Sequence, residues 1–346
     1  MRLCLKLRPE PEVPTPLEFL FAAQKKTKKD EKSEKCVFSA GFGVISDVFS
    51  KRRTMTGSIL RGIGSFYTVL CDEDGREYTL RAQKKLRHQK MTPMVGDHVR
   101  FTPGQGEEDG WLEEILPRKS MMERPSVANV DMLMLVVASV PQPDMLLCDK
   151  LILRAEKGGM IPAICVNKID LGDGLAEQIR REYVGTQLRV FSVSAHEGTG
   201  IAELREAMRG RVTCLAGQSA VGKSSLLNAL FDLELETGGL SRKTERGRHT
   251  TRRAEMMAVD GMFVLDTPGF SLLELENGID PQDFAQLYPE YNALAGECRF
   301  QPCLHDREPG CAVHAAVDAG KLGAARWQRY RELLAQVREN WKGRYE

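Results

Sequence analysis

Residues 217–224 read Gly217-Gln218-Ser219-Ala220-Val221-Gly222-Lys223-Ser224. The apolar stretch Val212–Ala216 precedes this segment, and a helical pattern from Gly222 to Phe231 follows it. Glycines in such a loop let the backbone wrap around phosphate groups, and the N–H groups at a helix N-terminus favour anions. The segment therefore predicts a phosphate-binding loop that makes nucleotide contacts as far as Ser225. Within it, Lys223 would reach the β- and γ-phosphates and Ser224 would ligate Mg²⁺.

A second candidate motif reads Asn167-Lys168-Ile169-Asp170 and follows the apolar stretch Ile161–Val166. Parallel α/β sheets bind ligands beyond the carboxyl ends of their strands, where this tetrapeptide is expected to lie. The carboxylate of Asp170 can accept two hydrogen bonds, which suits the N1–H and exocyclic amine of guanine and not adenine. We expect Asn167 to bridge the base and the phosphate loop, and the stem of Lys168 to lie over the ring. The same tetrapeptide is also common in surface turns.

A further apolar stretch, Leu188–Val193, ends in Ser194-Ala195. Small residues at this point would let a backbone N–H group approach the guanine O6 atom. The dipeptide carries little information alone, and its value comes from its place one β–α unit after Asp170. Together the two motifs predict a guanine pocket.

The stretch Met262–Leu265 leads into Asp266-Thr267-Pro268-Gly269. An aspartate in this position can hold Mg²⁺ through water, and the Gly269 N–H can contact the γ-phosphate. Upstream, either Thr250 or Thr251 would complete the magnesium shell in the triphosphate state, and the sequence does not separate the two. A solvated basic loop is the alternative for that upstream segment.

Phe270 stands directly after Gly269, where many GTPases place the glutamine that orients the attacking water. A phenylalanine ring neither donates nor accepts a hydrogen bond in this role, so another group must position the water. His249 is the candidate for this catalytic task, beside Lys223 and Gly269. A histidine that merely packs is the alternative. We expect slow turnover by the isolated protein and faster turnover with a partner.

The order of the motifs is unusual, because most GTP-binding domains begin with the phosphate loop. Here the guanine motifs at 167–170 and 194–195 precede the phosphate motifs at 217–224 and 266–269. Each loop still follows its own strand, so a circular permutation of the chain leaves the spatial site intact. The segment after Gly269 then runs directly into the C-terminal region.

Two kinds of periodicity indicate the fold. Short β-rich runs predict a small OB-like barrel at 66–70, 77–80, 99–101 and 111–115. Longer alternation predicts an α/β domain with a mostly parallel sheet. Its expected strands are 132–138, 161–166, 188–193, 212–216 and 262–265, and its expected helices are 143–157, 175–183, 201–208 and 222–231. The predicted domains are an N-terminal extension (1–53), the barrel (54–118), a circularly permuted GTPase domain (119–277) and a zinc-binding helical domain (278–346).

Three cysteines and one histidine gather in a short C-terminal segment, namely Cys298, Cys303, His305 and Cys311. The other six cysteines are scattered singly, which is typical of reduced thiols in the cytosol. Clustered thiols in such a chain indicate a metal, and a Cys₃His set matches one structural zinc ion. A redox cluster is the alternative, and His314 is a possible substitute for His305.

Composition says little about partners, because 49 basic and 48 acidic residues leave a formal net charge of +1. The longest apolar run, Met132–Val140, is far shorter than the roughly 20 residues of a membrane-spanning helix. We therefore expect a cytoplasmic protein without membrane contact, and nothing in the sequence indicates a dimer. Local charge is more informative: basic residues gather in three segments, 81–90, 242–253 and 321–346. Together with a small barrel, they favour RNA as a partner.

The sequence resembles the circularly permuted bacterial GTPases of the RsgA (YjeQ/EngC) family over about residues 54–334. Besides the nucleotide and zinc motifs, the match includes Val95-Gly96-Asp97, Pro117-Arg118, Arg124-Pro125, Ala128-Asn129-Val130-Asp131 and Glu308-Pro309-Gly310-Cys311. The extension has no motif that matches the family, and Arg252 stands where the family often has a third threonine. This last departure leaves the Mg²⁺ ligand open between Thr250 and Thr251.

The resemblance implies an OB-fold domain, a central GTPase that binds GTP or GDP with Mg²⁺, and a C-terminal zinc domain. It also implies late maturation of the 30S ribosomal subunit, with rRNA binding controlled by the nucleotide and hydrolysis stimulated by the subunit. Two other interpretations remain open from the residues alone. One is a GTP sensor that does not hydrolyse, which Phe270 supports, and the other is an RNA-binding protein whose GTPase domain serves only structure.

Overall fold

The structure is a computed structural model that describes residues 54–83, 85–86, 91–104, 108–122, 126–172, 174–231, 255–259, 261–266 and 279–342. These residues separate into two compact units, whose boundary falls between Pro117 and Arg118. Met94–Gly96 belongs to the second unit, although it lies within the sequence of the first. Each unit has a hydrophobic core of its own.

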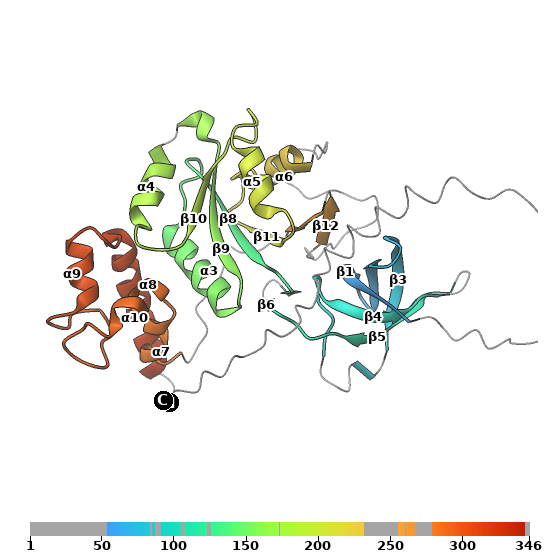
Figure 1. The fold of residues 1–346 in the computed structure, drawn as a ribbon, viewed down its shortest axis with the longest axis horizontal. Coiled ribbons are helices and arrows are strands. Elements are labelled where there is room, and N and C mark those ends of the chain that lie inside the picture. Colours follow the sequence, from blue (N-terminus) through green and yellow to red (C-terminus); the bar gives the residue numbers. More distant parts are fainter. Residues whose placement is uncertain are drawn as a thin grey trace, which may run out of the picture. The chain divides into compact units, whose positions relative to one another are not determined.

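Five strands form the first unit, namely β1 (Met55–Ile63), β2 (Phe66–Cys71), β3 (Glu77–Ala82), β4 (His98–Thr102) and β5 (Gly110–Ile115). β1 pairs with both β2 and β4, β2 pairs with β3, and β5 pairs with both β3 and β4. The pairings close on themselves, so the strands form a barrel (Figure 1). Its interior holds alternate apolar side chains, among them Ile59, Val69, Leu80 and Leu112. The predicted OB-like barrel is confirmed.

The β-rich runs of the sequence do not include strand β1, because its glycines interrupt the strand pattern. Gly57 weakens the β-pattern of the sequence, because glycine has low strand propensity. In the folded chain, however, Gly57 faces β2 so closely that a Cβ atom would lie 2.7 Å from Cγ1 of Val69. The close approach of the two strands requires glycine there. Arg81, the first residue of the basic segment 81–90, lies in β3.

The second unit contains a six-stranded sheet in the order β10-β9-β8-β11-β13-β12. The strands are β8 (Met132–Ala138), β9 (Ile161–Asn167), β10 (Arg189–Ser192), β11 (Val212–Ala216), β12 (Glu255–Val259) and β13 (Met262–Asp266). All neighbours are parallel except β12, which runs antiparallel to β13. The predicted mostly parallel sheet is confirmed, and β12 is an addition. A further short pair, β6 (Met121–Met122) and β7 (Val127–Ala128), precedes the sheet.

Helices on both faces explain why every residue of β8 is buried. The helices are α3 (Met145–Lys157), α4 (Gly174–Glu182), α5 (Ile201–Met208) and α6 (Lys223–Phe231), with a 3₁₀ turn, η1 (Ile169–Leu171). Met132, Met134 and Val136 pack in one core with the apolar side chains of α5 and α6. Because side chains alternate along a strand, the intervening residues of β8 point to the opposite face, where α3 lies. The four predicted helices of this domain are confirmed.

Four helices follow, namely α7 (Pro281–Gln286), α8 (Pro289–Ala295), α9 (Ala312–Asp318) and α10 (Ala324–Lys342). Their core is aromatic: the rings of Tyr288 and Tyr291 stack at 5.0 Å, and Tyr330 meets both rings edge-on. α10 contacts α7 and α9, and it also contacts α3 and α4 of the sheet domain (Figure 1). The helical region therefore packs against α3 and α4 of the sheet domain.

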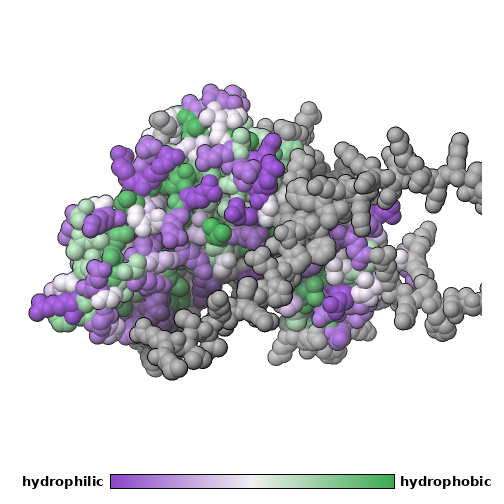
Figure 2. Space-filling view, viewed as in Figure 1, coloured by the Kyte–Doolittle hydropathy of each residue, from purple (hydrophilic) through white to green (hydrophobic). Residues whose placement is uncertain are grey.

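Among the described residues, no helix has both the length and the apolar composition needed to cross a bilayer. α10, with 19 residues, carries charged side chains along its length. On the face drawn in Figure 2, hydrophilic residues surround small hydrophobic patches.

Candidate nucleotide and metal sites

The loop between β11 and α6 holds the sequence predicted to bind phosphate. Gly222 has a φ of +93°, and a Cβ atom there would lie 2.5 Å from Nδ2 of Asn167. Glycine is therefore required both for the backbone conformation and for the approach of the neighbouring loop. Ala220 also has a positive φ, +67°, which is uncommon for a residue with a Cβ atom. Glycine therefore suits the loop at Gly222, whereas Ala220 is held in a conformation that alanine rarely adopts.

Several groups of this loop face outward. Ser219, Ala220 and Ser224 are exposed, whereas Val221 is buried beneath them. Nζ of Lys223 donates hydrogen bonds to the carbonyl oxygens of Gly217 at 2.7 Å and Gln218 at 2.9 Å. The ammonium group therefore lies over the loop, at the start of a helix. An anion placed there meets a positive charge and the N–H groups of the first helical turn.

Asn167, at the end of β9, joins three loops through its side-chain amide. Its Nδ2 donates to the carbonyl oxygen of Val221 at 3.0 Å, and its Oδ1 accepts from the N–H of Ala195 at 3.1 Å. The side chain is almost fully buried, at 2% exposure. The sequence predicted that Asn167 reaches the phosphate loop, and the structure places it there. Its bond to Ala195 explains why the Ser-Ala dipeptide lies beside the same pocket.

Asp170 is exposed and accepts a hydrogen bond from Oγ of Ser194 at 2.6 Å. This hydrogen bond lowers the pKa of the Asp170 carboxyl below its usual value. The group is therefore ionised at neutral pH, and its second oxygen is available to a ligand. The Ser-Ala dipeptide predicts only a backbone contact at the pocket, and the hydrogen bond by which the Ser194 hydroxyl orients Asp170 is a finding of the structure. The small size of residue 194 was the available signal.

Lys168 links the same loops with its ammonium group. Nζ donates to the carbonyl oxygens of Ala220 at 2.6 Å and Val140 at 3.0 Å. The aliphatic stem is therefore stretched across the space between the Asp170 loop and the phosphate loop. This geometry suits a planar ring that lies against the stem.

The remaining nucleotide candidates are only partly described. The backbone of Asp266 ends β13 and pairs in register with Leu215 of β11, two residues before the phosphate loop. Parallel neighbours end at the same edge, so the Asp266 loop starts beside that loop. His249, Thr250, Thr251 and Gly269 lie outside the described residues.

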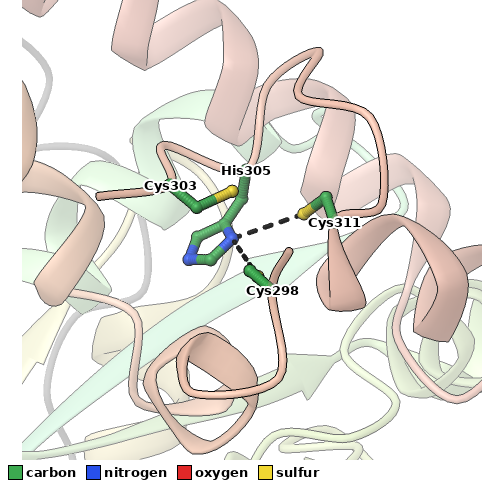
Figure 3. A group of neighbouring side chains, drawn as sticks. All are labelled: Cys298, Cys303, His305 and Cys311. Atoms are coloured by element: carbon green, nitrogen blue, oxygen red, sulfur yellow. Dashed lines mark hydrogen bonds between the residues drawn. The ribbon is translucent and has the colours of Figure 1, made fainter. Parts of the chain in front are cut away.

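The Cys₃His cluster assembles from one loop and the start of α9 (Figure 3). One ligand atom from each of Cys298, Cys303, His305 and Cys311 lies within 4.8 Å of the others. Nδ1 of His305 faces the sulfur atoms, at 3.4 Å from Cys311 and 3.7 Å from Cys298. Three sulfurs and one imidazole nitrogen in a buried group match the tetrahedral donor set of zinc.

Burial determines which charge the cluster can hold. Burial raises the pKa of the Cys303 thiol to about 12 and lowers the pKa of His305. A thiolate is therefore unfavourable there unless a positive charge accompanies it, and a divalent metal ion supplies that charge. His314 does not join the group, because its Nε2 bonds to the backbone oxygen of His305 at 3.2 Å.

Two acidic residues, Asp306 and Glu308, stabilise the loop that carries His305, a role that the sequence does not predict. The carboxylate of Glu308 accepts from the N–H groups of Leu304 at 3.1 Å and Asp306 at 2.9 Å. These bonds fold the loop that carries His305. Asp306 pairs in turn with Arg331 and Arg338 of α10. The Glu-Pro-Gly turn was a signal for the first of these roles, and nothing local signalled the second.

The C-terminal basic segment is largely neutralised within the fold. Arg326 and Arg329 pair with Asp149, and Arg331 and Arg338 pair with Asp306. The interpretation of 321–346 as a basic surface for RNA is therefore wrong for Arg326 and Arg329, whereas the side chains of Arg331 and Arg338 remain 31% and 38% exposed. A count of charges along the sequence does not reveal which of them meet acids from distant segments.

A phosphate loop, a guanine-type loop and a Ser-Ala loop that meet at one sheet edge, in permuted order, define a circularly permuted P-loop nucleotide-binding protein. The family model described as RsgA GTPase matches residues 115–276, and the model for the RsgA N-terminal domain matches 56–112. The chain belongs to the RsgA GTPase family and is a GTP hydrolase.

Similar proteins and solved structures support the same family assignment. The small ribosomal subunit biogenesis GTPase RsgA of Ruminiclostridium cellulolyticum is 40% identical over 83% of this chain and 96% of its own length. The protein of the same name from Moorella thermoacetica is 42% identical over 82% and 97%. YjeQ from Thermotoga maritima has a TM-score of 0.69 at 32% identity, covering 82% of this chain and 99% of its own. YloQ, a circularly permuted GTPase, has a TM-score of 0.69 at 29% identity, covering 85% and 98%.

Proposed function

We propose that this GTPase binds the small ribosomal subunit and hydrolyses GTP during late maturation of that subunit. Support comes from relatives named for small-subunit biogenesis, which align with this chain over almost their whole length. The structural observation that carries the nucleotide-binding part of the proposal is the bridge from Asn167 to Val221, because it joins a guanine-type loop to a phosphate loop. We further propose that the protein works in the cytoplasm as a monomer.

We assign the guanine base to the pocket of Asp170, the Lys168 stem and the loop of Ser194 and Ala195. The phosphates would lie on the loop of residues 217–225, with Lys223 at the β- and γ-phosphates. Mg²⁺ would be held by Ser224, by Asp266 through water, and by Thr250 or Thr251 in the triphosphate state. This assignment uses the positive charge and the exposed groups of the phosphate loop.

Hydrolysis needs a contact to the γ-phosphate and a group that positions the attacking water. We assign the γ-phosphate contact to Gly269 and the positioning of the attacking water to His249. Phe270 occupies the place of the water-orienting glutamine and cannot perform that task. Subunit docking would complete the alignment, so hydrolysis should be slow in isolation.

We assign one structural Zn²⁺ to Cys298, Cys303, His305 and Cys311. The buried Cys₃His geometry supports this assignment. The domain division proposed is an extension (1–53), a barrel (54–118), a GTPase domain (119–277) and a zinc domain (278–346). In this scheme the barrel and the zinc domain bind rRNA in a manner that depends on the nucleotide. The basic segments at 81–90 and 242–253 are the candidate contacts, since Arg326 and Arg329 of α10 are enclosed in ion pairs.

The decisive experiment is a titration of GTP hydrolysis by the purified protein with small ribosomal subunits. Large subunits serve as the control, and Lys223→Ala serves as the protein control. Hydrolysis that rises with small subunits only, and not in Lys223→Ala, supports the proposal. Equal stimulation by both subunits, or none, would contradict it. Subunit binding that is the same with GDP and with a GTP analogue would contradict nucleotide control.

A further inference from the structure

α10 holds the loop that carries the proposed metal ligand His305. Nε1 of Trp327 donates to the backbone oxygen of His305 at 2.8 Å. The Tyr330 hydroxyl donates to the backbone oxygen of Leu304, and Nε of Arg331 pairs with Asp306 at 2.8 Å. Three consecutive residues of the ligand loop are thus bonded to one helix. The geometry of the cluster and the position of α10 therefore depend on each other.

A different set of α10 side chains reaches the GTPase domain. Nη1 of Arg326 lies 2.8 Å from Oδ1 of Asp149 in α3, and Nε of Arg329 pairs with Oδ2 of the same carboxylate. The Tyr183 hydroxyl also donates to Asp149, at 2.6 Å. Asp149 is fully buried, and Nη1 of Arg329 extends the cluster to Glu182 at the end of α4, at 2.7 Å.

The two helices that receive these arginines lead back to the nucleotide loops. α3 begins after Asp144. In its first turns, Leu147 and Cys148 line a small cavity that Gly217 and Gln218 of the phosphate loop line as well. α4 begins shortly after η1, which contains Asp170. Asp149 thus directly follows, in sequence, the cavity-lining residue Cys148.

The ion-pair cluster around Asp149 is a stiff connection because Asp149 and Arg326 are buried and Arg329 is largely enclosed. Removing one partner from such a pair leaves an uncompensated buried charge, which is strongly destabilising. Sliding or tilting α10 against α3 would have the same effect. Loosening of the ligand loop would also leave Trp327 and Tyr330 without their acceptors. A well-ordered metal-ligand loop therefore favours a fixed position of α10 against α3, beneath the phosphate loop, and the converse also holds.

We propose that α10 couples the Cys₃His metal site to the nucleotide pocket through Asp149, so that metal and guanine nucleotide bind cooperatively. The inference rests on the nucleotide and metal sites proposed above. Asp149 acts here as a positioning residue that touches neither ligand. Coupling is reciprocal by thermodynamic necessity, so each ligand raises the affinity of the other by the same factor.

The first test measures zinc affinity of the full-length protein by competition with a chromogenic chelator, in excess Mg²⁺. GDP at saturation should tighten zinc binding by about fivefold or more, the lower range of measured couplings. ADP, which the Asp170 pocket does not match, should leave zinc affinity unchanged. This arm needs no variant and no stable metal-free protein. Equal zinc affinity with and without GDP would overturn the inference.

The second test removes the connection while leaving both sites intact. Asp149→Asn takes away the charge that holds Arg329 and turns an amide N–H₂ or a neutral oxygen toward it. GDP should then change zinc affinity less than twofold. The matched control is Glu177→Gln, which removes a carboxylate from the exposed surface of α4. It should keep the wild-type coupling. If Asp149→Asn does not fold by circular dichroism, Arg329→Met takes its place.

The outcomes separate this inference from the function on which it rests. If GDP raised the zinc affinity of the folded Asp149→Asn or Arg329→Met variant as much as that of the wild type, the role of the Asp149 ion pairs would be overturned. Absence of fluorescent-GDP binding to the zinc-loaded wild-type protein would overturn the nucleotide site together with the coupling. Stimulation by ribosomal subunits is tested separately and does not enter either arm.

Discussion

Nδ2 of Asn167 donates a hydrogen bond to the backbone oxygen of Val221, 54 residues further along the chain, at a distance of 3.0 Å. The same side chain accepts from the N–H of Ala195. One buried amide therefore fixes the relative positions of three loops that arrive from three different strands. The chain order of those loops is irrelevant to this contact, which is why a permuted sequence can build an ordinary guanine nucleotide pocket.

Asn167→Ala should weaken GDP binding by about 10- to 100-fold and destabilise the protein by about 1–3 kcal/mol. The reason is that two buried hydrogen bonds are lost and their backbone partners are left unsatisfied. Fluorescent-GDP titration and urea unfolding measure the two effects. Asn292→Ala, which loses one exposed amide bond to Gln286, is the matched control and should bind GDP normally. Wild-type affinity in Asn167→Ala would show that the bridge does not shape the pocket.

Asp170→Asn should exchange guanine preference for xanthine preference. The ionised carboxylate accepts from two donors of guanine, whereas an amide offers one acceptor and one donor, which suits the N1–H and the 2-oxo group of xanthine. Loss of one or two hydrogen bonds to a charged group corresponds to about 1.5–6 kcal/mol. GDP affinity should therefore fall at least tenfold, while XDP affinity rises. Unchanged GDP affinity by calorimetry would place the base elsewhere.

His305→Ala should lose zinc, whereas His314→Ala should retain it. Nδ1 of His305 faces the cysteine sulfurs, while the ring of His314 packs on Trp327 and bonds to a backbone oxygen. The measurement is metal content by mass spectrometry after dialysis against a weak chelator. Chelation of the wild-type protein should lower its melting temperature. Zinc retained by His305→Ala and lost by His314→Ala would reverse the ligand assignment.

Glu156→Gln should stabilise the protein at high pH. Burial, assisted by the neighbouring Glu290 carboxylate, raises the pKa of Glu156 to about 7 from a usual value of 4.5. The folded state therefore holds the proton more tightly, and stability from this group is present below pH 4.5 and lost as pH rises through about 7. The variant should match the wild type near pH 4 and exceed it by about 1 kcal/mol at pH 8, a value reduced for partial exposure.

Urea unfolding at the two pH values measures this difference. Glu177→Gln is the control, because its carboxylate lies on the exposed surface of α4 and should show no pH-dependent gain. A constant difference between Glu156→Gln and wild type across the pH range would contradict the assigned pKa.

Motif spacing was enough to predict the loops of the nucleotide site. Asn167, Asp170 and Lys223 each follow a short apolar strand or begin a helix, and such local patterns survive any rearrangement of the chain. The four ligand candidates of the metal site were also predicted, because thiols and an imidazole spaced this closely in a reduced chain are typical of zinc ligands. In contrast, β1 and β12 were missed, since glycines and methionines obscured their strand pattern.

The sequence by itself determined which loops carry chemistry, because glycine placement, strand hydrophobicity and side-chain type are local properties. Only the tertiary structure decided which arginines of the C-terminal helix are paired with acids. Asp149 and Arg326 are 177 residues apart in sequence, and their ion pair joins α10 to α3 inside the fold. Nothing local distinguishes Arg326 from a solvated arginine, because ion pairing depends on which distant segments the hydrophobic core brings together.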